Sequence, residues 1–297
     1  MHKTTLEQWR MFLAVAQHGG FNQAAQAIHK SQSSIHHAVK KLEEQLGVIL
    51  FEIEGRKALL SEHGELLKRR GRFLIEEVER IESVAQTLSG GVEAGLSIAV
   101  DEAFPPYILY EVMELVSGLF PQLKLDIIET VLSGSNELIQ SGKACLGISP
   151  IPMPQGLNED LCEIEFLAVS SPDHPLQHHV TFQGDTLSTE ALKPYRQIVV
   201  RDSALHTQVD QGWLGSEQRW TVSHVRSSID LVSKGLGFAW LPKAVIQDKL
   251  DKGELIPLPL ERGSTRQAIM HLNYRDADAL GPAAREFMAQ LRLKFMD

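Results

Sequence analysis

The segment from Phe21 to Gly47 constrains the fold most, because it predicts two helices joined by a very short turn. Its second part, SQSSIHHAVKKLEEQLG, has apolar residues at 35, 39, 42 and 46, which is the stripe of an amphipathic helix. Ser31 is suited to cap the start of this helix and Gly47 to end it. The preceding FNQAAQAIH predicts a short helix, capped by Asn22, whose small alanines allow close contact between helices. This order of elements indicates a helix-turn-helix unit.

The outward side chains of the longer helix are of the types that read double-stranded DNA. A helix in the major groove forms hydrogen bonds with base edges near its start and contacts phosphates with other residues. Counting from Ser31, we predict base contacts for Gln32, Ser33 and His36, and phosphate contacts for Ser34, His37, Lys40 and Lys41. The alternative is a bundle of packed helices with a solvated charged face, because helical patterns easily mimic this geometry.

The flanking segments favour the helix-turn-helix interpretation. An amphipathic run from Leu6 to Ala16, closed by HGG, predicts a first helix. After Gly47, two short strands at 48–53 and 57–60 are predicted around a turn at Gly55. Arg56 and Lys57 would lie at the tip of this wing, where they could reach the neighbouring DNA backbone or minor groove.

Residues 61–88 predict one long helix with an apolar seam of its own. Its positions 67, 71, 74, 78, 81, 85 and 88 alternate in steps of four and three, which is a heptad pattern. Because the chain has no second long heptad, the expected partner is the same helix of another copy, giving a homodimer. Packing of this helix on its own domain is the alternative. Residues 89–91 (SGG) then break the helix and supply a hinge.

From residue 95 onward, predicted strands alternate with predicted helices, which is typical of an α/β fold. Strands are expected at 96–101, 123–130 and 144–150, with helices at 107–120 and 135–141 between them. A similar rhythm runs from EIEFLAVSS through RQIVVR and SHVRSSIDLVSKGLGFAWLP to RQAIMHLNYR, and a helix at 282–295 ends it. We predict two lobes of one mixed fold, with a ligand cleft between them.

These patterns divide the chain into four parts. They are a winged helix-turn-helix domain (1–60), a dimerising linker helix (61–89), a hinge (90–94) and a two-lobed domain (95–297). Lobe I would comprise about 95–165 and 268–297, and lobe II about 166–267.

The charge of the chain is distributed unevenly along these parts. The net charge is −9, whereas a nucleic-acid-binding protein usually has a basic surplus. Residues 1–61, however, hold seven Lys and Arg against five Asp and Glu, while residues beyond 90 hold 17 against 27. Only the first part is therefore expected to face DNA. No apolar run reaches the roughly 20 residues that span a bilayer, and a secretory leader is lacking, so the cytoplasm is the expected location.

No motif of a familiar enzyme class is present, and we predict no catalytic residue, metal or cofactor. GxSxG, HExxH, a P-loop and GxGxxG are all missing. The histidines His174, His178 and His179 near Cys162 lack the spacing of tetrahedral ligands. Cys145 and Cys162 are expected to be buried structural thiols, with redox sensing as the alternative.

Several of these motifs together carry a resemblance to a known family. They are FNQAAQAIHKSQSSIHHAVKKLEEQLGVILFE, GRKALLSEHGE, the heptad helix, SPDHPL at 171–176, GLGFAWLP at 235–242 and REFMAQLR at 285–292. The chain resembles the LysR-type transcriptional regulators over essentially its whole length. The resemblance implies a winged helix-turn-helix, a dimerising linker helix and an effector domain folded like a type 2 periplasmic binding protein. Family members are commonly tetramers that bend promoter DNA and respond to a small co-inducer.

Effector-site candidates follow from the expected cleft, because such clefts bind ligands between strand ends and helix N-termini, where free amides favour anions. The wall candidates are Asp101, Glu102, Phe104, Leu132, Ser133, Gly134, Ser135, Ser149, Ile151, Arg201, Asp202, Ser223, His224, Arg226 and Trp240. Ser133 to Ser135 form the strongest anion site by chemistry. Asp101 and Glu102 oppose a simple dicarboxylate through Coulomb repulsion. Phe104, Trp240 and Trp213 suggest an aromatic or mixed-charge metabolite, unless these rings belong to the core.

The leading hypothesis is therefore a sequence-specific DNA-binding regulator controlled by a small effector. Its expected partners are promoter DNA, the effector, further copies of itself as a dimer or tetramer, and RNA polymerase at the bacterial nucleoid. The alternative is a two-lobed ligand-binding protein or enzyme without DNA-binding activity.

Overall fold

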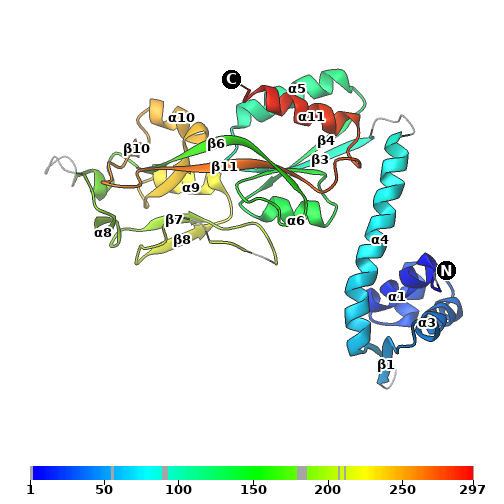
Figure 1. Cartoon of the computed structure of the whole chain (residues 1–297). Coiled ribbons are helices and arrows are strands. Elements are labelled where there is room, and N and C mark those ends of the chain that lie inside the picture. Colours follow the sequence, from blue (N-terminus) through cyan, green and yellow to red (C-terminus); the bar gives the residue numbers. More distant parts are fainter. Residues whose placement is uncertain are drawn as a thin grey trace. The chain divides into compact units, whose positions relative to one another are not determined.

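The computed structural model describes residues 3–54, 57–88, 93–178, 186–206, 208–210 and 212–296. The chain divides into two compact units, Met1–Ser89 and Gly90–Asp297. Figure 1 shows the elements of each unit, and they are taken in turn below. None of the helices within the described ranges is both long and apolar enough to cross a membrane.

Three helices form the body of the N-terminal unit: α1 (Leu6–His18), α2 (Phe21–Ala27) and α3 (Gln32–Leu46). Phe12 of α1 and the stripe Ile35, Val39 and Leu42 of α3 are buried in their common core. The predicted cap at Ser31 is confirmed, since its hydroxyl accepts a 3.2 Å hydrogen bond from the amide of Ser34. The left-handed residue Gly47 ends α3, as expected.

The predicted cap at Asn22 is wrong. Helix α2 already begins at Phe21, and Gly20 precedes it with no side-chain cap. The ring of Phe21 packs against Phe51, with the ring centroids 5.6 Å apart. Packing of this partly buried aromatic ring therefore accounts for a helix start two residues earlier than a cap at Asn22 would give.

The predicted wing consists of the antiparallel strands β1 (Phe51–Glu54) and β2 (Lys57–Leu60). The first strand begins later than expected, because the carboxylate of Glu43 accepts hydrogen bonds from the amides of Leu50 (2.7 Å) and Phe51 (3.3 Å). These bonds tie the start of the strand back to α3. The predicted tip residues Gly55 and Arg56 lie outside the described residues.

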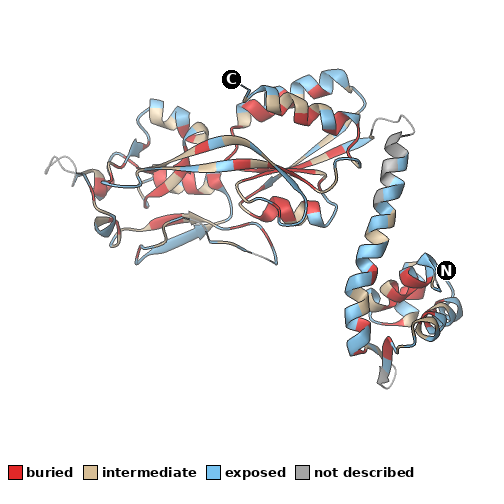
Figure 2. Ribbon diagram, in the orientation of Figure 1, coloured by how far each residue is buried: buried red, intermediate tan, exposed pale blue. Residues whose placement is uncertain are grey.

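Helix α4 (Glu62–Leu88) follows, and the hydroxyl of Ser61 caps it by accepting the amide of Gly64 at 2.9 Å. Its apolar seam is divided between two faces. Leu67 and Ile75 pack against the core of the N-terminal unit, so the self-packing alternative holds for this part of the helix. A second set of apolar side chains on α4 is exposed, as the pale blue along this helix in Figure 2 illustrates: Leu66, Phe73, Leu74 and Ile81.

Gly71 allows α4 to approach α1 closely. A Cβ atom at Gly71 would lie 2.7 Å from the Trp9 ring, which is too close unless the ring or the helix moves. We expect Gly71→Ala to destabilise the N-terminal unit by about 1–3 kcal/mol despite the better helix propensity of alanine. Denaturant unfolding monitored by circular dichroism measures this. The matched control is Gly118→Ala in a later helix, where nothing lies within 4 Å of the added atom; an equal loss in both variants would contradict the packing argument.

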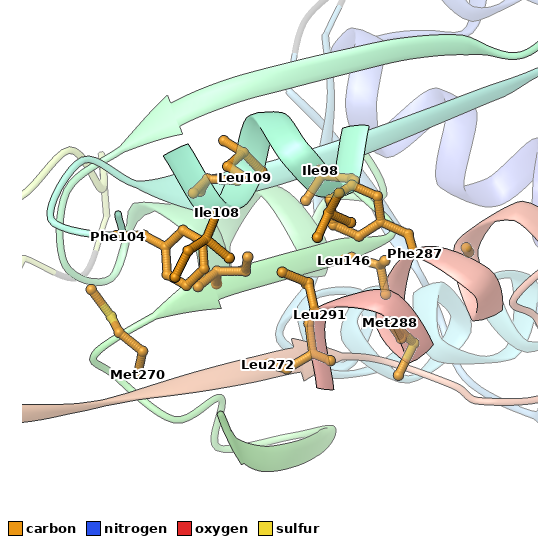
Figure 3. Close-up of a cluster of buried hydrophobic side chains, with 14 of the residues drawn as sticks. Ile98, Phe104, Ile108, Leu109, Leu146, Met270, Leu272, Phe287, Met288 and Leu291 are labelled. Atoms are coloured by element: carbon orange, nitrogen blue, oxygen red, sulfur yellow. The ribbon is translucent and has the colours of Figure 1, made fainter. Parts of the chain in front are cut away.

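The C-terminal unit is built on a mixed sheet with the order β10-β6-β11-β5-β3-β4. Strands β3 (Gly95–Asp101), β4 (Lys124–Thr130) and β5 (Leu146–Ser149) are parallel, and β11 (Thr265–Tyr274) joins them in the antiparallel sense. Helices α5 (Pro106–Leu119) and α11 (Pro282–Leu293) cover one face, and α6 (Gly134–Gln140) lies on the other (Figure 1). Figure 3 shows the core of this first lobe, where Phe287 and Leu291 of α11 meet Ile98 and Leu146 of the sheet.

The second lobe uses the far halves of two long strands. Strand β6 (Leu157–Ser170) pairs with β11 along its length, from Leu157 opposite Tyr274 to Leu167 opposite Thr265. At that end β6 also pairs with β9 (Ala239–Pro242) and β10 (Ile256–Pro257). The parallel pair β7 (Gln197–Val200) and β8 (Arg219–Val222) and helices α8 (Thr189–Leu192), α9 (Val225–Ser233) and α10 (Lys243–Asp251) complete the lobe. The predicted mixed two-lobed fold is therefore present.

Candidate functional sites

The outward face of α3 is polar and accessible. All of the residues that we predicted to contact DNA on this helix are exposed: Gln32, Ser33, Ser34, His36, His37, Lys40 and Lys41. They are held outward because Ile35, Val39 and Leu42 of the same helix are fixed in the core. A rigid helix that presents polar side chains at its start has the geometry of a major-groove reader.

Two of the side chains at this face already have protein partners. The hydroxyl of Ser31 lies 3.1 Å from that of Ser33 as well as capping α3. The imidazole of His36 lies against the ring of Phe21, with centroids 4.9 Å apart. Lys57 is the first residue of β2, next to the undescribed tip of the wing.

Hydrogen bonds join the two lobes of the C-terminal unit at several points. The carboxylate of Glu102, after β3, lies 2.6 Å from Nδ1 of His224 and accepts the amide of Val225 at 2.6 Å. This lobe I acid therefore occupies the N-terminus of α9 in lobe II. Its hydrogen bond and charge raise the pKa of His224. Glu137 of α6 makes a second pair of this kind, at 2.8 Å, with His206 of lobe II.

Ser133, one of the serines that we assigned to an anion site, contacts an acid of the protein itself. Ser133 Oγ donates a 2.5 Å hydrogen bond to Asp202 of lobe II. Asp202 also accepts the amides of Ala204 and Val209, both at 2.9 Å. An internal carboxylate thus lies where we expected an anionic ligand.

Asp101 is buried between the lobes. Its carboxylate accepts the amides of Ala103 (2.9 Å) and Leu132 (2.6 Å). Burial raises the pKa of Asp101 to about 7, since the hydrogen bonds that favour the ionised form only partly offset desolvation and repulsion from Glu102 and Asp202. The protonated and ionised forms of Asp101 are therefore both populated near neutral pH.

A cavity of about 220 Å³ lies between the lobes and is called the interlobe cavity below. It is lined by Asp101, Ala103, Val131, Leu132, Pro150, Phe166, Gln197–Val200, Gly212–Leu214, Val225, Trp240–Pro242 and Arg266–Ala268. Three predicted wall residues, Asp101, Leu132 and Trp240, line this cavity.

The other predicted wall residues lie elsewhere. Glu102, Phe104, His224 and Arg226 line a separate groove of about 860 Å³ that is bordered by α5, α9 and α10. The remaining ones line neither this groove nor the interlobe cavity: Ser133, Gly134, Ser135, Ser149, Ile151, Arg201, Asp202 and Ser223. Phe104 is 3% exposed and packs in the core of lobe I. For this ring, the alternative that it belongs to the core is therefore confirmed.

Sequence reasoning missed Gln197 and Arg266, which bring the polar chemistry to the interlobe cavity. Both lie at strand starts, Gln197 in β7 and Arg266 near the beginning of β11. An arginine near the start of the predicted strand RQAIMHLNYR is the signal that could have been followed. Its position in the cavity depends on the pairing of β11 with β6, which the sequence does not specify.

The two thiols are poorly suited to redox chemistry. Burial raises the pKa of Cys145 to about 11 and that of Cys162 to about 12, so both stay protonated at neutral pH. Cys145 Sγ also lies 3.3 Å from the carbonyl oxygen of Ser97. Among the described residues, no three His, Cys, Asp or Glu side chains come together as metal ligands.

Known proteins resemble the chain along most of its length. YhaJ, a probable HTH-type transcriptional regulator of Escherichia coli strain K12, is 28% identical over 271 residues, which cover 90% of this chain and 89% of the relative. A probable hydrogen peroxide-inducible genes activator of Streptomyces viridosporus is 28% identical over 314 residues, covering 98% and 97% of the two chains.

Solved structures share the fold at lower sequence identity. ArgP from Mycobacterium tuberculosis matches with a TM-score of 0.65 and 19% identity, over 96% of this chain and 95% of that one. Full-length LysG from Corynebacterium glutamicum, with its effector Arg bound, matches with a TM-score of 0.58 and 18% identity over 97% of each chain.

Two family models account for both units. The bacterial regulatory helix-turn-helix model of the lysR family matches residues 6–65, and the LysR substrate binding domain matches residues 89–295. The second match alone covers more than half of the chain. The chain therefore belongs to the LysR-type family of DNA-binding transcriptional regulators, with its effector-binding domain on the C-terminal side.

Proposed function

We propose that this regulator reads promoter DNA with the outward face of α3. Gln32, Ser33 and His36 would contact base edges, while Lys40 and Lys41 would contact phosphates together with Ser31, Ser34, His37, Arg56 and Lys57. The observation that carries the proposal is the exposure of the polar face of α3 opposite its buried stripe. The site of action would be the nucleoid in the cytoplasm, with RNA polymerase as a further partner.

We further propose that the reading unit is a homodimer through α4. The exposed apolar residues Leu66, Phe73, Leu74 and Ile81 support this, because a second copy of the helix would remove them from water. Two α3 helices would then enter successive major grooves of one duplex. Two such dimers would form a homotetramer, the state common in the family.

The effector is proposed to act at the junction of the two lobes. In LysG the bound effector is Arg, which places small-molecule binding in a protein of the same fold. Here the lobes are already joined by Glu102 with His224 and by Ser133 with Asp202. A ligand that binds one arrangement of the lobes more tightly than another would shift the population toward it. The DNA bend would change with the arrangement of the subunits.

Replacing Lys40 and Gln32 with alanine separates the two kinds of DNA contact. We expect Lys40→Ala to weaken binding about equally at all sites, by up to about tenfold, and to reduce the dependence of affinity on salt. Gln32→Ala should instead change the preference among sites by about 1–3 kcal/mol at one base position. Fluorescence anisotropy with promoter fragments at two salt concentrations measures both effects.

The control for this test is Lys124→Ala, which removes an exposed lysine of β4 in the C-terminal unit. It should leave DNA affinity unchanged. Unaltered binding and salt dependence in both α3 variants would show that another surface reads DNA.

A further inference from the structure

The interlobe cavity contains a cation without an acidic partner. The guanidinium carbon of Arg266 lies 4.1 Å from the ring centroid of Trp240, a cation–π contact. In the described part of the chain, Arg266 forms no hydrogen bond or ion pair with a carboxylate. Burial lowers the pKa of Arg266, although the group remains charged at any physiological pH. A half-buried arginine held over an aromatic ring is prepared for a planar anion such as a carboxylate.

Aromatic rings form the wall beside this arginine. The centroids of Trp213 and Trp240 are 5.8 Å apart, and Phe238 lies behind both of them, at 6.2 Å and 5.9 Å. Trp240 Nε1 donates to the carbonyl oxygen of Gly263 at 2.8 Å, so its polar group is already bonded. The two indoles that line the cavity therefore offer mainly ring surface, which favours a flat apolar body.

Gln197 lines the same cavity, and its side chain carries a buried acceptor that is unpaired within the described part of the chain. Its side chain is 4% exposed, and its amide nitrogen donates to the carbonyl oxygen of Trp213 at 2.6 Å. The Oε1 atom has no hydrogen-bond partner among the described residues. An unpaired buried acceptor destabilises the protein, so a ligand that reaches Oε1 with a hydrogen-bond donor would remove that cost.

The size and charge of the interlobe cavity set further limits. A dry cavity of about 150 Å³ accommodates benzene. The interlobe cavity, at about 220 Å³, thus has room for one substituted six-membered ring. Asp101 also lines it and accepts two backbone amides. A second anionic group on a ligand would be repelled by this carboxylate in its ionised form.

We propose that the interlobe cavity binds a small aromatic monocarboxylate that carries a hydroxyl or amino substituent. The carboxylate lies on the guanidinium of Arg266, the ring lies against Trp213 and Trp240, and the substituent donates to Gln197 Oε1. This assignment rests on the proposed function, since it names the chemical class of the effector.

Calorimetry of the full-length protein with simple probes tests the class. The panel consists of the three hydroxybenzoates, the aminobenzoates, benzoate, phenol and phthalate. We expect one hydroxy- or aminobenzoate to bind about tenfold more tightly than benzoate, which lacks the donor, and than phenol, which lacks the carboxylate. Phthalate should bind more weakly than benzoate. Binding should also quench the fluorescence of Trp213 and Trp240.

Variants then assign the two polar contacts. Arg266→Gln should weaken binding of the best benzoate about tenfold or more and leave phenol nearly unchanged. Gln197→Leu should equalise the affinities for that ligand and benzoate, because only the substituted ring uses the amide. The matched control is Arg262→Gln, which removes an exposed arginine outside the cavity lining and should have no effect.

Three outcomes would overturn the assignment: no binding by any probe, tighter binding of phthalate than of benzoate, or unchanged affinity in both Arg266→Gln and Gln197→Leu. DNA binding by the same sample without ligand keeps this test separate from that of the proposed function. A protein that binds promoter DNA and ignores the panel disproves only the effector class. A protein that binds no DNA disproves the proposed DNA contacts, whatever the panel shows.

Discussion

Replacing Ile81 with aspartate is expected to disrupt the proposed dimer, leaving a monomer, and to lower the DNA affinity at least about a hundredfold. The side chain is 62% exposed on α4, beyond the part of the helix that packs on the core of its own unit. A buried aspartate in a helix pair would repel its symmetric counterpart and lose hydration. Linking two reading units typically contributes about 10² to 10⁴ to the affinity, and this gain would be lost.

Analytical ultracentrifugation and anisotropy with a full promoter fragment measure the two effects together. Glu79→Asp is the matched control, since it places aspartate at another exposed position of α4 without changing the charge. It should remain dimeric and bind DNA normally. A dimeric Ile81→Asp protein with intact DNA affinity would refute the assignment of this helix face.

Raising the pH from about 5 to about 8 is expected to destabilise the C-terminal unit by about 3 kcal/mol through Asp101 alone. The pKa of Asp101 is about 7 in the folded unit, against 3.8 as its ordinary value. Between these values the folded state holds a proton that the unfolded state has released. The stabilising contribution is therefore full below the ordinary value and is lost as the pH rises through the folded one.

Asp101→Asn should flatten this part of the pH profile, because the amide does not titrate. Denaturant unfolding at several pH values, followed by the fluorescence of the tryptophans in the C-terminal unit, gives the slope for each protein. Asp173→Asn, at an exposed turn, is the control and should keep the slope of the parent protein. An unchanged slope in Asp101→Asn would place the titrating group elsewhere.

The N-terminal unit was largely predictable because its signals are local. The steps between Ile35, Val39 and Leu42 specify a helix and its buried face without knowledge of any other segment. The caps at Ser31 and Ser61 depend on residues only three positions away. The exception was Asn22, where the packing of the partly buried Phe21 outweighed capping preference.

The division of the α4 seam could not be read from the heptad pattern. An apolar residue every three or four positions indicates that one face of a helix is buried, but it does not indicate which segment or which copy of the chain buries it. Gly71 faces Trp9 of its own unit, whereas Ile81 remains exposed. Distinguishing these faces requires the position of α1, which is a tertiary contact.

The cavity residues were hidden for a related reason. Gln197 and Arg266 are 69 residues apart and line one cavity, and the position of Arg266 there depends on the local register in which β11 pairs with β6. A shift by one residue would turn Arg266 to the other face of the sheet. Expected polar residues such as Ser133 instead found partners within the chain, since Asp202 reaches it from the opposite lobe.

If the effector acts between the lobes as proposed, the carboxylate of Glu102 at the start of α9 sets the effector concentration at which the regulator responds. Any molecule that requires the lobes to part must first displace this internal acid. Its apparent dissociation constant is then the intrinsic one divided by the fraction of molecules whose lobes have parted. Substitutions that weaken the contact between Glu102 and the start of α9 would therefore lower the metabolite concentration at which genes respond. They would do so without changing any residue that contacts the metabolite. Changes at this contact would therefore alter the sensitivity of the regulator without altering which effector it recognises.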